Sequence, residues 1–168
     1  MSGWTSLTSA DLLVSLRVPI GWDALAVDES TLQLQGGAEA DDYRPTVTLE
    51  AGRPEESGRD WFEAFTSSVV PELAAEVPGF DLIGTSRSTL SSRNAQVFAV
   101  HARRDDPAGP LPPTSQVQAW VWAGSHRMLA ISASTTTERE AVDLPVFDEI
   151  IASIRLLPPR PSEASELS

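Results

Sequence analysis

His101 and His126 are the side chains best suited to acid–base chemistry or metal binding. Neither has a second histidine at ligand spacing, and the chain has no cysteine to complete a zinc site. The acidic run Glu39, Asp41 and Asp42 lacks the residue pattern of a calcium-binding loop. We therefore expect no metal and no cofactor, a structural role for both histidines, and a solvated loop for the acidic run.

The glycine motifs of nucleotide binding and hydrolysis are also missing. Gly36-Gly37 is not followed by the lysine of a phosphate-binding loop, and no Gly-x-Ser-x-Gly nucleophile turn occurs. With no catalytic residues to nominate, we predict that the protein is not an enzyme. A deep pocket lined by either histidine and a carboxylate would support the alternative that the protein is an enzyme.

The charge balance restricts the partners. All 12 basic residues are arginine, against 24 acidic residues, which gives a formal net charge of −12. Such a field repels phosphate backbones, so nucleic-acid binding is not expected. A partner with a basic or apolar surface is favoured, although a high net charge also serves solubility alone.

The N-terminal residues do not read as a signal peptide. Met1 to Ala10 carries no basic residue and no long apolar run. No stretch of the chain approaches the roughly 20 apolar residues of a membrane span. We expect a cytoplasmic protein.

The spacing of apolar residues along the chain predicts where the strands and helices lie. Alternation of apolar and polar residues predicts strands, and recurrence at three and four residues predicts two helices, one carrying Phe62 to Leu73 and one carrying Phe147 to Ile154. Pro71 is expected to kink or restart the first helix, and Asp143 and Pro145 fit the first turn of the second. The expected strands are residues 14–18, 31–35, 46–50, 80–90, 95–103, 115–123 and 127–134.

This order predicts an α+β fold with one antiparallel sheet of about six to seven strands flanked by helices. Residues 11–157 form the expected single domain, after an N-terminal extension at 1–10 and before a disordered tail at 158–168. A tight hairpin is expected around Gly124-Ser125-His126.

Two central strands are apolar on both faces, and this pattern carries the functional hypothesis. Phe98 and Val100 alternate with Val97 and Ala99, and a pair of tryptophans alternates with three apolar residues in the next strand. Both faces of such strands must be covered, by helices of the same domain or by a partner. Both alternatives remain open, and the candidate partner-binding residues are Phe98, Val100, Trp120, Trp122 and Met128.

Short motifs resemble a known family. Val18-Pro19-Ile20-Gly21-Trp22 resembles a strand end of the PsbP/Mog-like α/β superfamily. Residues 43–50 and Ser153-Ile154-Arg155-Leu156 are similar to strands of its actinobacterial LpqN/LpqT branch. The resemblance covers roughly residues 12 to 157. It implies a twisted antiparallel sheet between helices and a non-enzymatic role, in a superfamily that includes Eag-type secretion chaperones.

The leading hypothesis is a non-enzymatic protein-binding module. Its more specific form is a chaperone or adaptor associated with secretion. It would hold an apolar or basic segment of a partner, or a second copy of the chain, on its sheet face. The alternative is a carrier of a small amphiphile or lipid in an envelope-related role, as the LpqN/LpqT resemblance implies. Because LpqN/LpqT proteins carry an acylated cysteine and this chain has none, the envelope role is the second choice.

Overall fold

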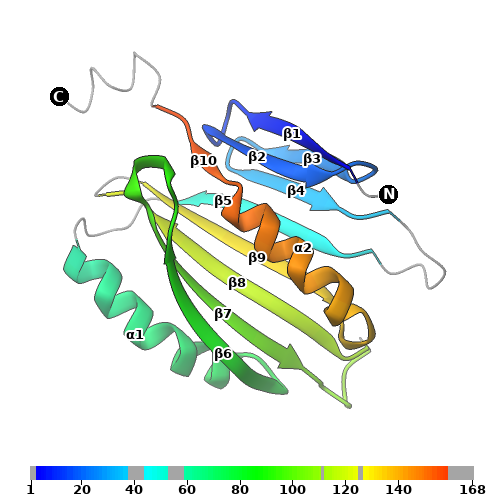
Figure 1. Ribbon diagram of the computed structural model, residues 1–168. Coiled ribbons are helices and arrows are strands. Elements are labelled where there is room, and N and C mark those ends of the chain that lie inside the picture. Colours follow the sequence, from blue (N-terminus) through cyan, green and yellow to red (C-terminus); the bar gives the residue numbers. More distant parts are fainter. Residues whose placement is uncertain (1–2, 38–43, 53–58, 111, 125–126, 159–168) are drawn as a thin grey trace.

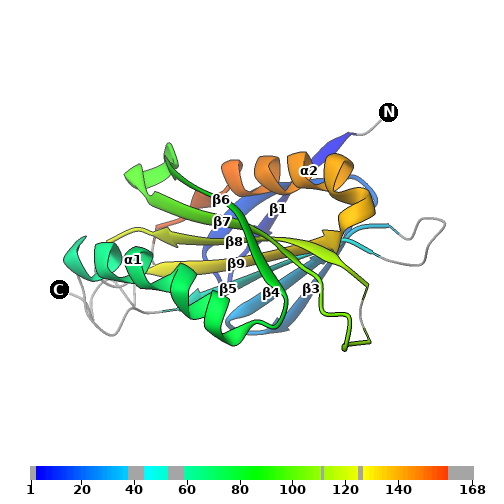
Figure 2. The ribbon, with the colours of Figure 1, turned by 90° about the horizontal axis from the view of Figure 1, so that it is seen from below.

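The fold has two sheets and two helices. The computed structural model describes residues 3–37, 44–52, 59–110, 112–124 and 127–158. Within them the chain forms ten β-strands and two α-helices (Figure 1). The two helices lie on opposite sides of the larger sheet (Figure 2). The predicted α+β class is confirmed.

The larger sheet has seven strands, and each neighbouring pair is antiparallel. Its spatial order is β3-β4-β5-β9-β8-β7-β6. The predicted hairpin joins β8 to β9, although Ser125 and His126 themselves lie outside the described residues. The strands are β3 (Asp23–Asp28), β4 (Thr31–Gln35), β5 (Thr46–Gly52), β6 (Phe80–Thr89), β7 (Gln96–Arg104), β8 (Thr114–Trp122) and β9 (Met128–Thr136).

A smaller sheet and one helix cover the first face of the larger sheet. The smaller sheet has the order β1-β2-β10, and α2 (Glu140–Ala152) lies beside it. Apolar side chains alternate along β2 and meet those of the larger sheet in the main core. The small strands are β1 (Trp4–Ser9), β2 (Val14–Pro19) and β10 (Arg155–Leu156).

Helix α1 (Arg59–Glu76) packs on the second face, over β7 and β8. Phe62 and Val69 of the helix form a second core cluster with Phe98 and Val100 of β7. The helix does not restart at Pro71, as one form of the prediction had it, because the residue lies inside one continuous helix. Its exposed ring costs the helix one backbone hydrogen bond without ending it.

The two-faced strands are confirmed. Val97, Val117, Ala119 and Val121 belong to the main core, whereas Phe98 belongs to the cluster beneath α1. Because successive side chains of a strand point to opposite faces, β7 and β8 separate two apolar layers. The domain's own elements therefore cover one face of these strands with the main core, and the other face with α1 over Phe98, Val100, Trp120 and Trp122.

Several elements differ from the sequence expectations. Trp4–Ser9 is a strand paired with β2, so the expected extension at residues 1–10 contributes to the fold from β1 onward. Asp23–Asp28 is an edge strand that periodicity did not reveal. Helix α2 begins at Glu140, and Asp143 lies in its first turn as predicted, although its side chain is buried rather than exposed at the helix end. Residues 159–168, the expected disordered tail, lie outside the described residues.

Candidate functional site

An aromatic cluster joins α1 to β7 and β8. Phe62 stacks on Trp122 with ring centroids 5.5 Å apart and planes 13° apart. Phe65 meets Trp120 edge-on at 5.2 Å, and Trp120 also lies 6.2 Å from Phe98. We define the aromatic cluster as these five rings and Trp61, which stacks on Phe65.

The structure brings most of the predicted partner-binding residues into this cluster. Phe98 and Val100 are buried beneath α1, with exposed fractions of 5% and 1%. Trp120, Trp122 and Met128 are half-buried. Phe98 and Val100 therefore contribute to packing here, and only the other three present part of their surface to solvent. Binding of a partner through these residues stays a prediction.

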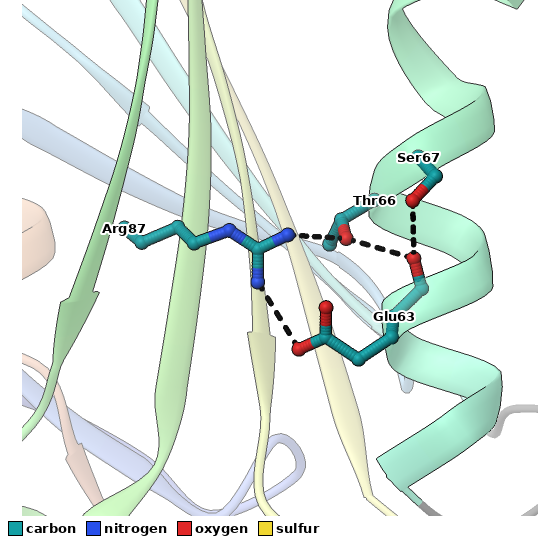
Figure 3. A network of polar contacts seen from close by, with 4 residues as sticks. All are labelled: Glu63, Thr66, Ser67 and Arg87. Atoms are coloured by element: carbon teal, nitrogen blue, oxygen red, sulfur yellow. Dashed lines mark hydrogen bonds and ion pairs between the residues drawn. The ribbon is translucent and has the colours of Figure 1, made fainter.

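A polar network holds α1 against the edge of the sheet (Figure 3). Arg87 of β6 donates to the Glu63 carboxylate at 3.2 Å and to the Thr66 hydroxyl at 2.7 Å. The same guanidinium lies 5.4 Å from the centre of the Phe98 ring. Arg87 therefore adds polar and cation–π contacts to the apolar packing of the helix. Its charge and its strand position gave no sign of this role in the sequence.

Beyond α1, the same face of the sheet is polar. Strand pairing aligns Gln33, Thr48, Ser132 and Gln118 in one row across four strands. A second row contains Gln35, Thr46, Ser134 and Gln116. Among the described residues no helix packs over these rows, and their side chains are half-buried, or exposed at Ser132.

Gln116 and Ser134 of the second row line a cavity of about 140 Å³ together with Gly109, Pro110 and Pro112 of the loop between β7 and β8. We call the other six residues of the two rows the open strip. It carries no charged side chain, although the protein has a formal net charge of −12. The next row of paired residues leads through Ala130 to Trp120 and Phe98. The strip is therefore continuous with the exposed edge of the aromatic cluster. In the sequence these glutamines, serines and threonines are only the polar positions of alternating strands, which does not show that they line up across the sheet.

The other face contains a cavity of about 270 Å³ between α2 and strands β6 to β8. Its polar lining includes His101 of β7 and Asp148 of α2. We call it the His101 cavity; it is lined by Gly84, Thr85, Ser86, Ala99, His101, Val117, Leu144 and Asp148.

Hydrogen bonds connect His101 to an ion pair. His101 Nε2 lies 3.1 Å from the Ser115 hydroxyl oxygen, and Arg103 Nε donates to Glu140 at 3.0 Å. Hydrogen bonding from Arg103, assisted by Ser115, lowers the pKa of the Glu140 carboxyl below its ordinary value. Partial burial raises the pKa of Asp148, against a smaller lowering by His101.

This arrangement is the histidine–carboxylate pocket that bears on the enzymatic hypothesis. The hydroxyl group in contact with His101 is that of Ser115, and with an exposed fraction of 0% it is closed to a substrate atom. The exposed Thr85 and Ser86 hydroxyl groups line the cavity but make no hydrogen bond with His101 among the described residues. No hydroxyl group of the described residues is therefore both exposed and hydrogen-bonded to this histidine. His126, the other candidate, lies outside the described residues, as do Glu39, Asp41 and Asp42.

An apolar hollow of about 430 Å³ lies between the two sheets at one end of α2. Trp4 and Trp22 line it, together with Ile20 and Val142, which are 68% and 64% exposed. Exposed aliphatic side chains beside two indole rings form a surface suited to an apolar ligand.

The described residues also bear on metal binding and membrane insertion. They contain no group of three or more histidine, aspartate or glutamate side chains placed to hold a metal ion. No helix in the described part of the chain has both the length and the apolar character needed to cross a membrane.

Solved structures share this architecture over nearly the whole chain. LpqN of Mycobacterium tuberculosis, involved in cell envelope biogenesis, is 16% identical with a TM-score of 0.63, covering 94% of this chain and 92% of LpqN. The cyanobacterial PsbP of Synechocystis sp. PCC 6803 is 10% identical, also with a TM-score of 0.63, covering 93% and 94% of the two chains. The fold is PsbP/Mog-like.

The Ran-binding protein Mog1p of Saccharomyces cerevisiae extends the comparison to a eukaryote. It is 9% identical with a TM-score of 0.58, and the match covers 94% of this chain and 97% of Mog1p. No protein-family model and no curated protein matches the chain. At these identities the shared property is the PsbP/Mog-like fold, and the resemblance to LpqN is distant.

Proposed function

We propose that this protein is a non-enzymatic binding module that holds a protein partner on the open strip and the adjoining edge of Trp120. The observation that carries the proposal is the uncovered half of the sheet face on which α1 packs. One row of amide and hydroxyl side chains runs there across β4, β5, β9 and β8, and a second row continues it on β4 and β5. Such rows offer hydrogen-bond donors and acceptors beside an apolar anchor.

The chemistry of the surface defines the partner. Trp120 supplies a partly exposed aromatic ring, a residue type that often dominates binding energy at interfaces. The strip itself is uncharged, whereas Glu50 is exposed at its border and the whole protein is strongly acidic. A polar segment with an apolar anchor and basic flanks fits this surface. The yeast neighbour, a Ran-binding protein, supports a protein as the partner class.

Photo-crosslinking in cells tests the proposal directly. A photoreactive amino acid at Ser132, which is exposed in the strip, should crosslink one protein partner or a second copy of the chain. The matched control is the same amino acid at Thr8, which is exposed on β1. The product from position 132 should disappear when Gln118→Arg places an unpaired charge in the strip.

Two outcomes would contradict the proposal. Crosslinks of equal yield from positions 132 and 8 would mean that the strip has no partner of its own. A product that persists in a folded Gln118→Arg protein would place the contact elsewhere. A self-crosslink together with a dimer in analytical ultracentrifugation would identify the partner as a second copy.

The finer hypothesis is a cytoplasmic chaperone or adaptor connected with secretion. Its support is the acidic field, which suits a basic cargo segment, and the surface described above. Subcellular fractionation and the identity of the crosslinked partner test it. A partner unrelated to secretion, or recovery with the cell envelope, would refute it.

A carrier of a small amphiphile is the second candidate, and the apolar hollow favours it. The hollow exposes Ile20 and Val142 beside Trp4 and Trp22. After incubation with lipid vesicles, native mass spectrometry should show a bound lipid, which Val142→Asp should remove. Repeated recovery of protein without any adduct would count against a carrier.

A further inference from the structure

The His101 cavity has the features of a ligand site that is separate from the open strip. It lies on the α2 side of the sheet, whereas the strip lies on the α1 side. Its volume of about 270 Å³ is near the lower limit for small-molecule pockets. Ala99, Val117 and Leu144 supply apolar lining.

Hydrogen bonding identifies which nitrogen of His101 is available. His101 Nε2 lies 3.1 Å from the Ser115 hydroxyl oxygen and is engaged by it. In the tautomer that carries the ring proton on Nε2, this nitrogen donates to the Ser115 oxygen. In the neutral ring this leaves Nδ1 as an acceptor. Nδ1 has no hydrogen-bond partner among the described residues, so it remains for a ligand.

Asp148 supplies a second unused acceptor. Its carboxylate lines the same cavity and makes no hydrogen bond or ion pair with the described residues. The nearby cation, Arg103, is engaged by Glu140 and is also attracted to Asp81. Asp148 is therefore the charged group of the lining that has no ion-pair partner among the described residues, which favours a cationic ligand over an anionic one.

We propose that the His101 cavity binds a small organic cation through an alkylammonium group. Asp148 accepts one charge-assisted hydrogen bond from the ammonium, and His101 Nδ1 accepts another. The alkyl part contacts Ala99, Val117 and Leu144. The same chemistry is offered by a free amine and by a lysine side chain, and the experiment separates these sources.

Nuclear magnetic resonance provides the test, because the chain has only two histidines. His126→Gln leaves one imidazole, whose signals are those of His101. Butylammonium chloride and N-acetyl-lysine amide are titrated separately, with sodium butyrate as the anionic isostere and sodium chloride as the salt control. We expect saturable shifts of the His101 and Gly84 signals with an amine and no saturation with butyrate.

Two substitutions provide the matched variants. Asp148→Asn keeps the shape but removes the charge, and should weaken binding by about tenfold or more. A Cβ atom at Gly84 would have nothing within 4 Å, so Gly84→Leu should fold and fill the cavity. Tighter binding of butylammonium would identify a free amine as the source, and tighter binding of the lysine amide would identify a side chain.

The proposal is overturned if neither amine gives saturable shifts. It is also overturned if butyrate binds as tightly as butylammonium, or if both variants bind an amine as tightly as the parent protein does. Circular dichroism of each variant confirms that it is folded before it is titrated.

Discussion

Phe62→Ala tests whether α1 is a fixed part of the domain, because the burial of Trp120 and Trp122 on the sheet depends on this helix. The Phe62 side chain is 1% exposed and stacks on Trp122 at a centroid distance of 5.5 Å. Replacing it by alanine leaves a cavity between the helix and the sheet. If α1 belongs to the cooperative core, the whole domain must lose stability.

The expected loss is large. Phenylalanine-to-alanine substitutions in cores lower the free energy of unfolding by about 3–5 kcal/mol. With a urea m-value of about 2 kcal/mol per M, the unfolding midpoint should fall by about 1.5–2.5 M. Phe62→Leu retains most of the side chain and should cost less, which keeps the test usable if the alanine variant is poorly folded.

Urea unfolding is followed by tryptophan fluorescence and by far-ultraviolet circular dichroism. The cluster contributes three of the five tryptophans, so fluorescence reports on its packing. Coincident transitions with an unchanged m-value would show that helix and sheet unfold together. The control is Val142→Ala, whose side chain is 64% exposed and whose loss should change stability by less than about 0.5 kcal/mol.

A loss for Phe62→Ala no greater than that of the control would refute this packing of α1. A separate early transition of the helix would do the same. In either case Trp120 and Trp122 would lie beneath a helix that leaves the sheet easily. The hypothesis that these tryptophans bind a partner directly would then be favoured again. A large, cooperative loss instead restricts the partner surface to the open strip and the exposed edge of Trp120.

Three further predictions concern charged groups. Arg139→Ala should lower the free energy of unfolding by about 3–5 kcal/mol in thermal denaturation, because the Asp143 carboxylate, which is 3% exposed, loses its ion-pair partner. A loss no larger than about 1 kcal/mol, the size expected for an exposed ion pair, would contradict this prediction. Glu140 has a lowered pKa in the folded state, so its stabilisation by Arg103 is present above the ordinary value of 4.5 and is lost as the pH falls through the folded pKa. Arg103→Gln should therefore lower the free energy of unfolding at pH 7 and lower it much less in acid. An equal loss of stability at both pH values would refute this prediction. Asp148 has a raised pKa in the folded state, so its negative charge disfavours folding above that pKa. Asp148→Asn should therefore be slightly more stable than the parent protein at pH 7, and the difference should vanish well below pH 3.8, the ordinary pKa. A variant that is less stable at pH 7 would show that the carboxylate has a stabilising partner.

The spacing of apolar residues predicted strands and helices well in segments where that spacing followed a single strand or helix period. The alternation in Val14, Leu16 and Val18 specified β2, and the helical spacing of Phe62 and Val69 specified α1. The apolar residues on both faces of β7 and β8 indicated that both faces need cover, and left open whether the domain or a partner supplies it. In the structure the main core lies on one face and α1 packs over the apolar residues of the other. In each case the pattern reports which side chains must leave water, and that requirement is local.

Other elements left no such signature. The β3 sequence Asp23–Asp28 has no alternation because every residue of this edge strand is exposed. The pairing of β1 with β2 depends on a turn at residues 10–13 that composition did not mark. The burial of Asp143 depends on Thr135 and Arg139, which become neighbours only when α2 packs on β9.

By itself, the sequence determined the acidic charge, the absence of cysteine and the strands with two apolar faces. Each of these is a property of residues in chain order. Only the tertiary structure decided that α1 covers Phe98 and Val100, that the open strip is left uncovered, and that Asp148 joins His101 at one cavity. The physical reason is that cover, exposure and charge pairing are relations between elements distant in the chain, which packing creates and no local period encodes.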